Sequence, residues 1–336
     1  MIQKTYAARH RAISEEGAIE WSTAQQLAFG SLLAEGYDVR MSGEDAQRGT
    51  FATRHAVLTD QTTSAKYSPL YAFGLANNTK FSCYNSLLSE YGVMGFEYGY
   101  SIGSSKCLTI WVAQFGDFST VGQPVIDLLM ASGEVKWGLR SALTFFLPHG
   151  IDGQGPEHSS CKLERWLQLV GHKPDLSKER SENNGNTDLW NSNMRVMSLT
   201  TPANLFHALR SQMVHNFRKP LVIASPKKLL RHKSVKSNFK QFGPAQVIDA
   251  NTDLLEHGHS RLYKIIDDCK TDLVSGSDVK KVVFCHGQGY YDLVDQREKS
   301  GVKDMAIIRV EQISPFPADE FRAVLKKYSG KGVEFL

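Results

Sequence analysis

The sequence lacks any apolar run of the roughly 20 residues that a membrane-spanning helix needs, and therefore predicts no membrane span. Neither positive nor negative residues are in large excess. The 39 Lys and Arg against 35 Asp and Glu leave a net charge of +4, too small and too dispersed to indicate nucleic-acid binding. The five cysteines are an odd number without a CxxC pair, which predicts neither a zinc knuckle nor a disulfide framework and favours a reducing compartment.

What remains is an ordinary globular composition. The 336 residues are 41% hydrophobic and 22% charged, and the chain is long enough for two domains. We interpret residues 1–17 as an N-terminal tail. This tail has no apolar core, which excludes a secretory signal, and its Glu15 and Glu16 make it a weak transit peptide.

Helices and apolar strands alternate over residues 18–216. Ser22 is a suitable N-cap for a helix through Ala34, and Gly36 is a suitable stop. We expect strands at 37–41, 108–112, 143–147 and 194–199, and helices at 125–131 and from Thr201-Pro202 onward. This alternation predicts an α/β domain with a parallel sheet that is covered on both faces. The polar stretch 171–193 predicts a surface loop or a disordered insertion within that domain.

A second α/β unit is predicted over residues 217–336. Its expected strands are 221–224, 282–285 and 305–310. A basic run at 227–245 indicates a solvated face or, as the alternative, a site for an anionic ligand such as a coenzyme A phosphate. The final residues 332–336 read as the beginning of another strand, which predicts that this second unit is truncated.

The stretch from Ser82 to Gly103 carries one carboxylate, Glu90, and then a series of glycines. A glycine costs a helix about 0.8 to 1 kcal/mol relative to alanine. Gly95, Gly99 and Gly103 recur at every fourth residue and share one helical face, where another backbone can approach closely. Two interpretations stay open: tight packing within the chain with a solvated Glu90, or a contact surface for a second element.

A set of longer phrases resembles one family. Glu90, Gly95, Phe96 and Gly99 follow the spacing of the pyrimidine-binding domain of thiamine diphosphate enzymes. The wider sequence resembles the E1 component of the 2-oxoglutarate dehydrogenase complex in these phrases, which occur in the family's order: MSGEDAQRGTFATRH, NSLLSEYGVMGFEYGY, AQFGDF, LPHGIDGQGPEHSS, FRKPLVIASPKKLLRH and RVEQISPFP. The resemblance implies a transketolase-type pyrimidine-binding domain followed by a partial transketolase C-terminal-like α/β domain.

The resemblance implies thiamine diphosphate as cofactor. Glu90 would hydrogen-bond the pyrimidine nitrogen N1′ and share a proton with it, and Leu88 would support the bent cofactor from below. Phe118 matches the aromatic residue that stacks on the pyrimidine, and Gln114 could hydrogen-bond the same ring. Val112 departs from the family, where a glutamate usually precedes AQFGDF; this puts one supporting hydrogen bond in doubt.

His149 and His158 flank a glycine-rich loop that could close over a ligand. A histidine can bind the carboxylate of a 2-oxo acid or move protons, and the resemblance assigns His158 to the substrate. The catalytic candidates are therefore Glu90 and His158. A metal pair of His158 with Glu157 is a weaker alternative because no HExxH spacing accompanies it, and no metal ligand is predicted in this chain.

The family holds the diphosphate through Mg²⁺ with a Gly-Asp-Gly motif, which this sequence lacks. The resemblance therefore implies that this chain supplies half of a site, in a homodimer or with a separate diphosphate-binding domain. It implies oxidative decarboxylation of 2-oxoglutarate in the tricarboxylic acid cycle, with succinyl transfer to the lipoyl domain of the E2 component in the mitochondrial matrix. The alternatives are a 2-oxoadipate dehydrogenase E1 and a catalytically silent partner that only pairs with a full-length subunit.

Overall fold

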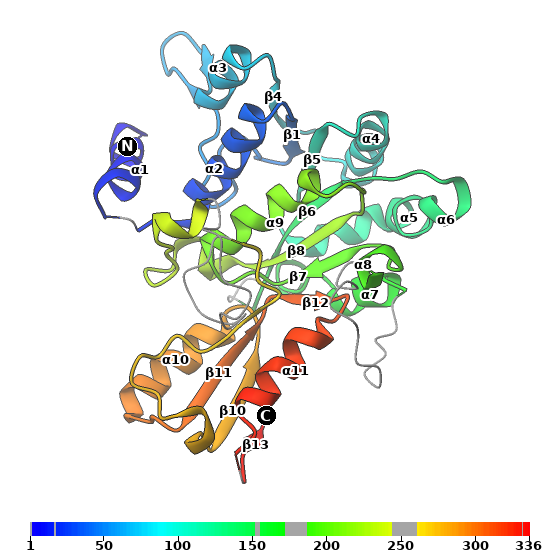
Figure 1. The fold of residues 1–336 in the computed structure, drawn as a ribbon. Coiled ribbons are helices and arrows are strands. Elements are labelled where there is room, and N and C mark those ends of the chain that lie inside the picture. The colour runs from blue at the N-terminus through cyan, green and yellow to red at the C-terminus, as the bar shows by residue number, and fades with distance from the viewer. Residues whose placement is uncertain (1, 17, 152–154, 172–186, 244–260, 331) are drawn as a thin grey trace.

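The computed structural model describes residues 1–336 apart from 1, 17, 152–154, 172–186, 244–260 and 331 (Figure 1). Among the described residues, no helix combines the length and the apolar character that crossing a membrane would require. The predicted loop 171–193 lies for the most part outside the described residues, as does the middle of the glycine-rich loop between His149 and His158.

The larger sheet has seven strands in the order β12-β7-β8-β6-β5-β1-β4. All neighbouring strands are parallel except β12, which runs antiparallel to β7. The bounds are β1 Asp38–Gly43, β4 Phe81–Asn85, β5 Cys107–Val112, β6 Thr144–His149, β7 Arg195–Met197, β8 Leu221–Pro226 and β12 Gln312–Ser314. Because the strands are parallel, their carboxyl ends meet at one edge of the sheet, where open α/β sheets bind ligands.

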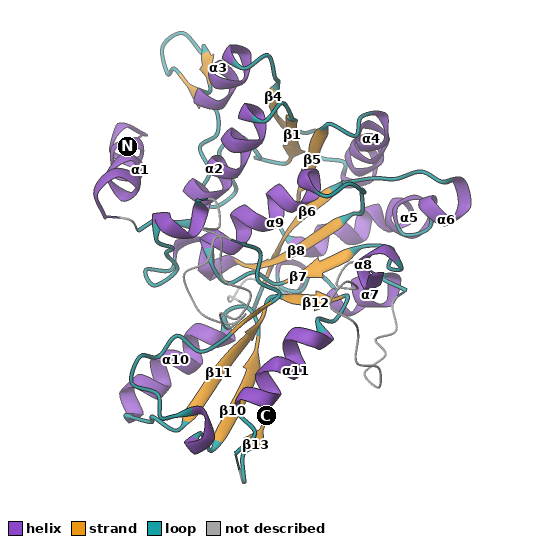
Figure 2. Ribbon diagram, in the orientation of Figure 1, coloured by secondary structure: helices purple, strands orange, loops and turns teal. Residues whose placement is uncertain are grey.

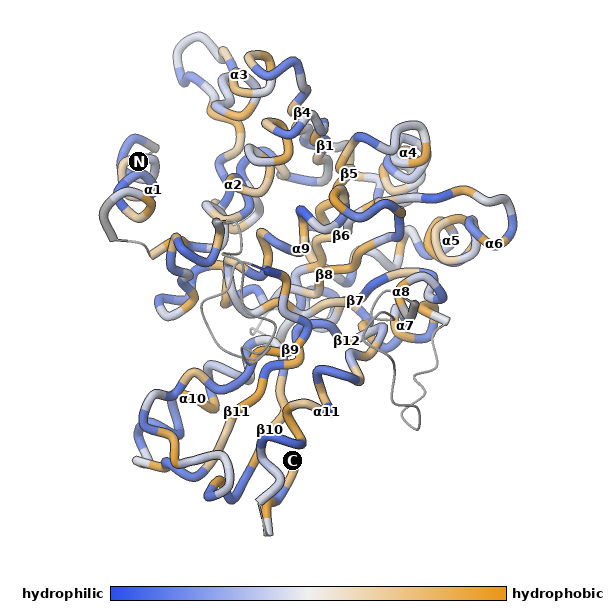
Figure 3. Tube along the Cα trace, viewed as in Figure 1, coloured by the Kyte–Doolittle hydropathy of each residue, from blue (hydrophilic) through white to orange (hydrophobic). Residues whose placement is uncertain are grey.

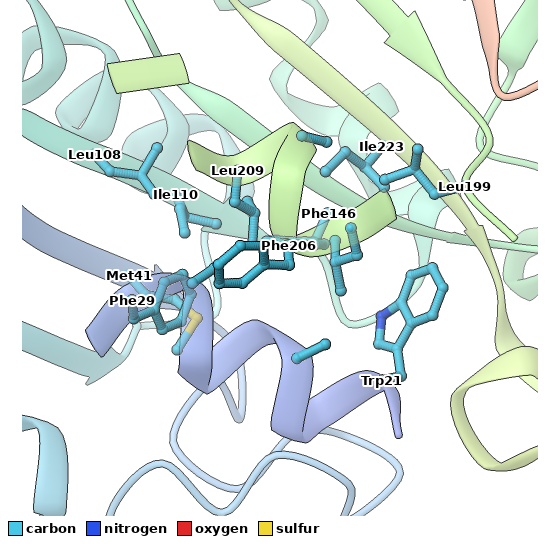
Figure 4. Close-up of a cluster of buried hydrophobic side chains, with 14 of the residues drawn as sticks. Trp21, Phe29, Met41, Leu108, Ile110, Phe146, Leu199, Phe206, Leu209 and Ile223 are labelled. Carbon is cyan, nitrogen blue, oxygen red and sulfur yellow. The ribbon is translucent and has the colours of Figure 1, made fainter. Parts of the chain in front are cut away.

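Helices cover both faces of this sheet (Figure 2). Every residue of β5 and of β8 is buried, as expected for strands that are covered on both sides. On one face lie α2 (Trp21–Ala34) and α9 (Pro202–Val214), and on the other lies α4 (Glu90–Gly103). The remaining helices of this region are α1 Ile2–Arg11, α3 Pro69–Ala76, α5 Gln123–Val125, α6 Gly133–Trp137, α7 Leu163–Leu169 and α8 Thr187–Trp190. Figure 4 shows the core on the α2 and α9 face, where Phe29 and Phe206 meet Met41, Ile110 and Phe146 from the sheet.

The smaller sheet has four strands in the order β13-β10-β11-β9. Their bounds are β9 Ile265–Ile266, β10 Lys281–Cys285, β11 Met305–Val310 and β13 Glu334–Phe335. Two helices, α10 (Gly289–Ser300) and α11 (Ala318–Lys327), flank it. Both helices alternate between hydrophilic and hydrophobic residues along the chain (Figure 3), the pattern of helices with one face on a core. A short hairpin lies apart from both sheets and pairs two strands of two residues each, β2 Leu58–Thr59 and β3 Lys66–Tyr67.

The predicted fold class is confirmed: the chain is α/β with a large, mostly parallel sheet. One strand was assigned to the wrong unit. Residues 221–224 do not open the second sheet, because β8 lies inside the first sheet between β7 and β6. After the second sheet has begun, the chain also returns to the first through β12. An apolar strand that is buried on both faces looks the same in sequence whichever sheet takes it.

The N-terminal boundary of α2 also differs from the prediction. The helix begins at Trp21 with Glu20 as its N-cap residue, so Ser22 does not cap it. Instead, the Ser22 hydroxyl accepts a hydrogen bond from buried Arg9 of α1 and donates one to Glu20. The same Arg9 donates to the carbonyl of Thr53 at 2.8 Å, so the N-terminal helix is attached to the body of the protein.

Candidate active site

The carboxyl edge of the larger sheet gathers the polar side chains that follow its strands. Glu44 follows β1, Glu90 begins the helix after β4, and Gln114 follows β5. His149 ends β6, and Lys227 comes directly after β8. Five neighbouring strands thus bring residues from five separate stretches of sequence to one edge.

The loop between β4 and α4 exposes apolar side chains. Leu87 is 84% and Leu88 76% exposed, values that large aliphatic side chains seldom show side by side. Glu90 is half-buried and occupies the first position of α4, where the helix dipole favours a negative charge. This loop therefore presents a carboxylate beside an uncovered apolar surface.

The glycine face of α4 is uncovered along much of its length. A Cβ at Gly95 would lie 3.6 Å from Val125, whereas nothing lies within 4 Å of a Cβ at Gly99 or Gly103. The interpretation of tight packing within the chain is therefore wrong for Gly99 and Gly103. The bare stripe is present, and it is open to a second element.

A buried ion pair ties α4 to the sheet. Glu97 is 1% exposed and accepts two hydrogen bonds from Arg40, at 2.7 and 2.8 Å, and one from Ser42 at 2.8 Å. Burial alone would lower the pKa of Arg40, but the hydrogen bonds and charge of Glu97 outweigh it and the pKa is raised. The sequence interpretation missed this pair. Its signal was an arginine inside a buried strand, which needs a partner.

The other side of the Arg40 guanidinium is covered by aromatic rings. The guanidinium lies 4.9 Å from the ring centroid of Tyr84, 5.2 Å from that of Phe96 and 4.5 Å from that of Tyr100. These rings are themselves partly exposed, between 37% and 61%. The ion pair and the rings hold the glycine-bearing helix in a fixed orientation at the edge of the sheet.

His158 lies within a cluster of aromatic rings after β5. Its ring centroid is 4.4 Å from Phe115 and 5.7 Å from Phe118, and those two phenylalanines are 5.6 Å apart. Phe115 is only partly buried and faces this cluster. Glu157 lies 3.2 Å from His158 Nδ1. Within the described part of the chain, no three or more His, Cys, Asp or Glu side chains are grouped to hold a metal ion.

Lys227 joins this cluster from the end of β8. Its ammonium group donates hydrogen bonds to the carbonyls of Gly150, at 3.2 Å, and of His158, and lies 5.1 Å from the centroid of Phe115. Lys227 is buried, so the basic run is not wholly the solvated face that its composition favours. The sequence interpretation did not assign Lys227 to the site, because the sequence does not show which lysine of a basic run is buried.

Two further histidines lie nearby. His149 Nδ1 accepts a hydrogen bond from the Cys161 amide at 3.1 Å. Burial, followed by the charges of His286 and Lys227, lowers the pKa of His149, and burial also lowers the pKa of His286. Both imidazoles are therefore neutral near pH 7. His286 comes from the second sheet and was also missed.

Gln114 is held by Glu44. Its side-chain amide donates to Glu44 Oε1 at 3.2 Å, while Glu44 Oε2 is buried without a hydrogen-bond partner among the described residues. An unsatisfied buried carboxylate oxygen is costly unless a ligand completes it. At the same place a Cβ on Gly43 would lie 2.1 Å from the carbonyl oxygen of Val112, so only glycine fits there.

The predicted site residues thus fall into two groups. Phe118 and His158 lie in one contact cluster with Phe115 and Lys227. Leu88 lies in the loop after β4 and Glu90 begins α4, and among the described residues no hydrogen bond or ring contact joins them to that cluster. The two groups share the carboxyl edge of the sheet, with Gln114 and Glu44 following the strands between them.

This arrangement defines an α/β domain whose candidate site lies at the carboxyl edge of a mostly parallel sheet. Residues 17–233 match the family described as "Transketolase, pyrimidine binding domain", and residues 252–335 match the family described as "2-oxoglutarate dehydrogenase C-terminal". The chain belongs to the family of transketolase-type pyrimidine-binding domains.

Similar proteins cover nearly all of this chain. A protein of Dictyostelium discoideum named "2-oxoglutarate dehydrogenase, mitochondrial" is 46% identical over 92% of the chain and 29% of its own length. A "2-oxoglutarate dehydrogenase E1 component" of Brucella anthropi is 42% identical over 94% and 29%. A "Probable 2-oxoadipate dehydrogenase complex component E1 homolog" of Caenorhabditis elegans is 43% identical over 93% and 32%. The chain thus spans about a third or less of these relatives.

Proposed function

We propose that this chain supplies the pyrimidine half of a thiamine diphosphate site in an E1 enzyme that oxidatively decarboxylates 2-oxoglutarate and transfers the succinyl group to a lipoyl group of E2. The observation that carries the proposal is Glu90 at the first position of α4, on the ligand-binding edge of the sheet beside exposed Leu88. When bound, the cofactor supplies the nucleophilic carbon that attacks the 2-oxo acid.

The side chains suit this role. Glu90 would hydrogen-bond the pyrimidine at N1′ and share a proton with it, and Leu88 would support the cofactor. Phe118 stacks on the ring, and Gln114, steadied by Glu44, contacts its polar edge. Glu44 Oε2 has no hydrogen-bond partner among the described residues, and the leucines are uncovered. A bound ligand would supply both the missing polar contact and the missing apolar contact.

His158 binds the substrate in this proposal. Its ring is fixed by Phe115 and Phe118, and its backbone carbonyl is held by Lys227. The ammonium group of Lys227 adds positive charge on the side where the carboxylates of a 2-oxo acid would lie. His158 would therefore bind the substrate carboxylate or move a proton to or from the bound substrate.

The diphosphate and its Mg²⁺ are assigned to a separate domain, because the family's Gly-Asp-Gly motif does not occur in this sequence. The mitochondrial name of the Dictyostelium relative supports a place in the mitochondrial matrix, although relatives are also named from bacteria. The Caenorhabditis relative supports 2-oxoadipate as the second candidate substrate, at 43% identity against 46% for the Dictyostelium protein.

Calorimetric titration of thiamine diphosphate and Mg²⁺ into the purified chain tests the half-site. We expect binding at micromolar strength, weakened about ten-fold or more by Glu90→Ala because a charge-assisted hydrogen bond is worth about 1.5–3 kcal/mol. Glu164→Ala, an exposed glutamate on α7, is the matched control and should bind as the unaltered chain does. Equal binding by Glu90→Ala would contradict the role of Glu90 and favour a silent pairing partner.

We also propose that the open glycine face of α4 is where a second protomer packs. Gly99→Leu places a side chain into open space, so the fold should keep its stability, while the close approach of a second backbone is blocked. We expect sedimentation to show a dimer for the unaltered chain and a dissociation constant raised about ten-fold or more by Gly99→Leu. Gly289→Leu, at another open glycine, is the control, and a purely monomeric unaltered chain at high concentration would count against the dimer.

A further inference from the structure

A cavity of about 340 Å³ lies between the beginning of α9 and the second sheet. Its lining includes Thr201, Asn204, Arg261, Cys269, Tyr290 and Arg309. The two units of the chain both contribute to it. None of these residues has a role in the function proposed above.

The thiol of Cys269 has polar neighbours at this cavity. Arg309 Nη2 donates a hydrogen bond to Cys269 Sγ at 3.0 Å, and the Tyr290 hydroxyl lies 3.8 Å from the same sulfur. The Cys269 side chain is exposed, so reagents in solution can reach it. A guanidinium beside a sulfur favours the thiolate over the thiol.

Arg309 is an independent sign that this place takes negative charge. It is 4% exposed and lines the cavity, yet it forms no ion pair with a carboxylate among the described residues, and its Nε has no hydrogen-bond partner. The nearby carboxylate of Glu311 is occupied by Thr200 and Asn204. A buried cation without a carboxylate partner requires another counter-charge, and the group nearest to this one is the sulfur of Cys269.

Charge and burial around Arg309 agree with this geometry. Burial alone would lower the pKa of the guanidinium, but the charges of Cys269 and Tyr290 outweigh it and raise that pKa above its usual value. Tyr290 also places its ring 4.2 Å below the guanidinium, which favours the cation. Arg309 therefore stays charged beside the sulfur at all physiological pH values.

The other four cysteines provide an internal contrast. Burial raises the pKa of Cys83 and of Cys107 to about 11, and that of Cys161 and of Cys285 to about 12. These thiols are therefore protonated near pH 7 and poorly reactive. All five cysteines are thiols, and Cys269 is the exposed one.

We propose that Cys269 is a redox-reactive thiol that peroxides oxidise to a sulfenic acid. The thiolate sulfur attacks one oxygen of hydrogen peroxide, a sulfur–oxygen bond forms and the oxygen–oxygen bond breaks. The sulfur loses two electrons and the peroxide gains them. The departing hydroxide takes the proton of the newly formed sulfenic acid and leaves as water, and the resulting sulfenate is in protonation equilibrium with sulfenic acid. Arg309 stabilises the anionic sulfur before the reaction and the sulfenate after it.

Peptide mapping after brief treatment of the whole chain with equimolar hydrogen peroxide and dimedone tests the proposal. Dimedone labels sulfenic acid, and we expect about ten times more label on Cys269 than on any other cysteine. Cys269→Ser should remove that label. Label spread evenly over the five cysteines, or centred on another one, would overturn the proposal.

The role of Arg309 is tested by the rate of alkylation with iodoacetamide at pH 7. We expect Cys269 in the unaltered chain to react about ten times faster than N-acetylcysteine, Arg309→Lys to keep most of this advantage, and Arg309→Met to lose it. Near-ultraviolet circular dichroism identifies a variant that fails to fold. If a variant fails to fold, the alkylation rate of Cys269 in the unaltered chain tests the proposal by itself. A rate equal to that of N-acetylcysteine would overturn the proposal.

Discussion

Replacing Glu90 by glutamine is expected to slow the exchange of the cofactor's C2 proton with solvent by about 10²–10⁴-fold, the usual contribution of a positioned acid or base. The reason is local. Glutamine keeps the size of Glu90 and a hydrogen-bonding group at the first position of α4, but it cannot share a proton with N1′. Cofactor affinity should therefore change far less than the exchange rate.

Proton exchange is measured by NMR after rapid acid quenching, in the enzyme assembled from this chain and a diphosphate-binding domain. Glu164→Gln, on the exposed face of α7, serves as the control and should exchange at the unaltered rate. The split between affinity and exchange separates a catalytic carboxylate from one that only holds the fold. If Glu90→Gln exchanges as fast as the unaltered enzyme, the proton-sharing role of Glu90 is wrong.

Replacing Glu97 by alanine is expected to lower the free energy of unfolding by about 3–5 kcal/mol, because it leaves the Arg40 charge buried without its partner. The loss should appear as a lower urea midpoint with an unchanged slope. The exposed pair of Glu35 and Arg210, at 2.7 Å, is the matched control. Glu35→Ala should cost about 1 kcal/mol or less.

A double variant shows whether the effect belongs to the pair. Arg40→Met together with Glu97→Leu removes both charges and keeps apolar volume, so it should recover most of the stability that Glu97→Ala loses. The aromatic rings of Tyr84, Phe96 and Tyr100 would then pack on a methionine instead of a guanidinium. A double variant as unstable as Glu97→Ala would show that the cost arises from packing and not from an unpaired charge.

The α/β class could be predicted from local sequence, and candidate site residues could be named from it. Apolar strands alternating with helices indicate a covered parallel sheet, and β5, β6 and β11 lie within two residues of their predicted bounds. The Glu90 motif and the phrase around His158 match a family pattern that can be recognised in the sequence alone. The helix predicted to begin at Thr201-Pro202 does begin there, and the Thr201 hydroxyl caps it by accepting a hydrogen bond from the Asn204 amide.

Partnerships between distant residues could not be predicted in the same way. Arg40 and Glu97 are 57 positions apart, and Lys227 reaches His158 across 69. Cys269 and Arg309 are 40 apart and lie on different segments of the second unit. Periodicity in the sequence indicates which face of an element is apolar. It does not indicate which distant element packs against that face.

By itself, the sequence determined the α/β class, the glycine-faced helix and the family phrases with their candidate residues, because each depends on residues close together in the chain. Only the tertiary structure decided that β8 belongs to the first sheet, that Glu97 is the partner of Arg40, that Lys227 is buried beside His158, and that Arg309 faces a thiol. The physical reason is that strand order and the pairing of buried charges depend on which surfaces pack together and exclude water. That packing involves the whole chain and not a local stretch of sequence.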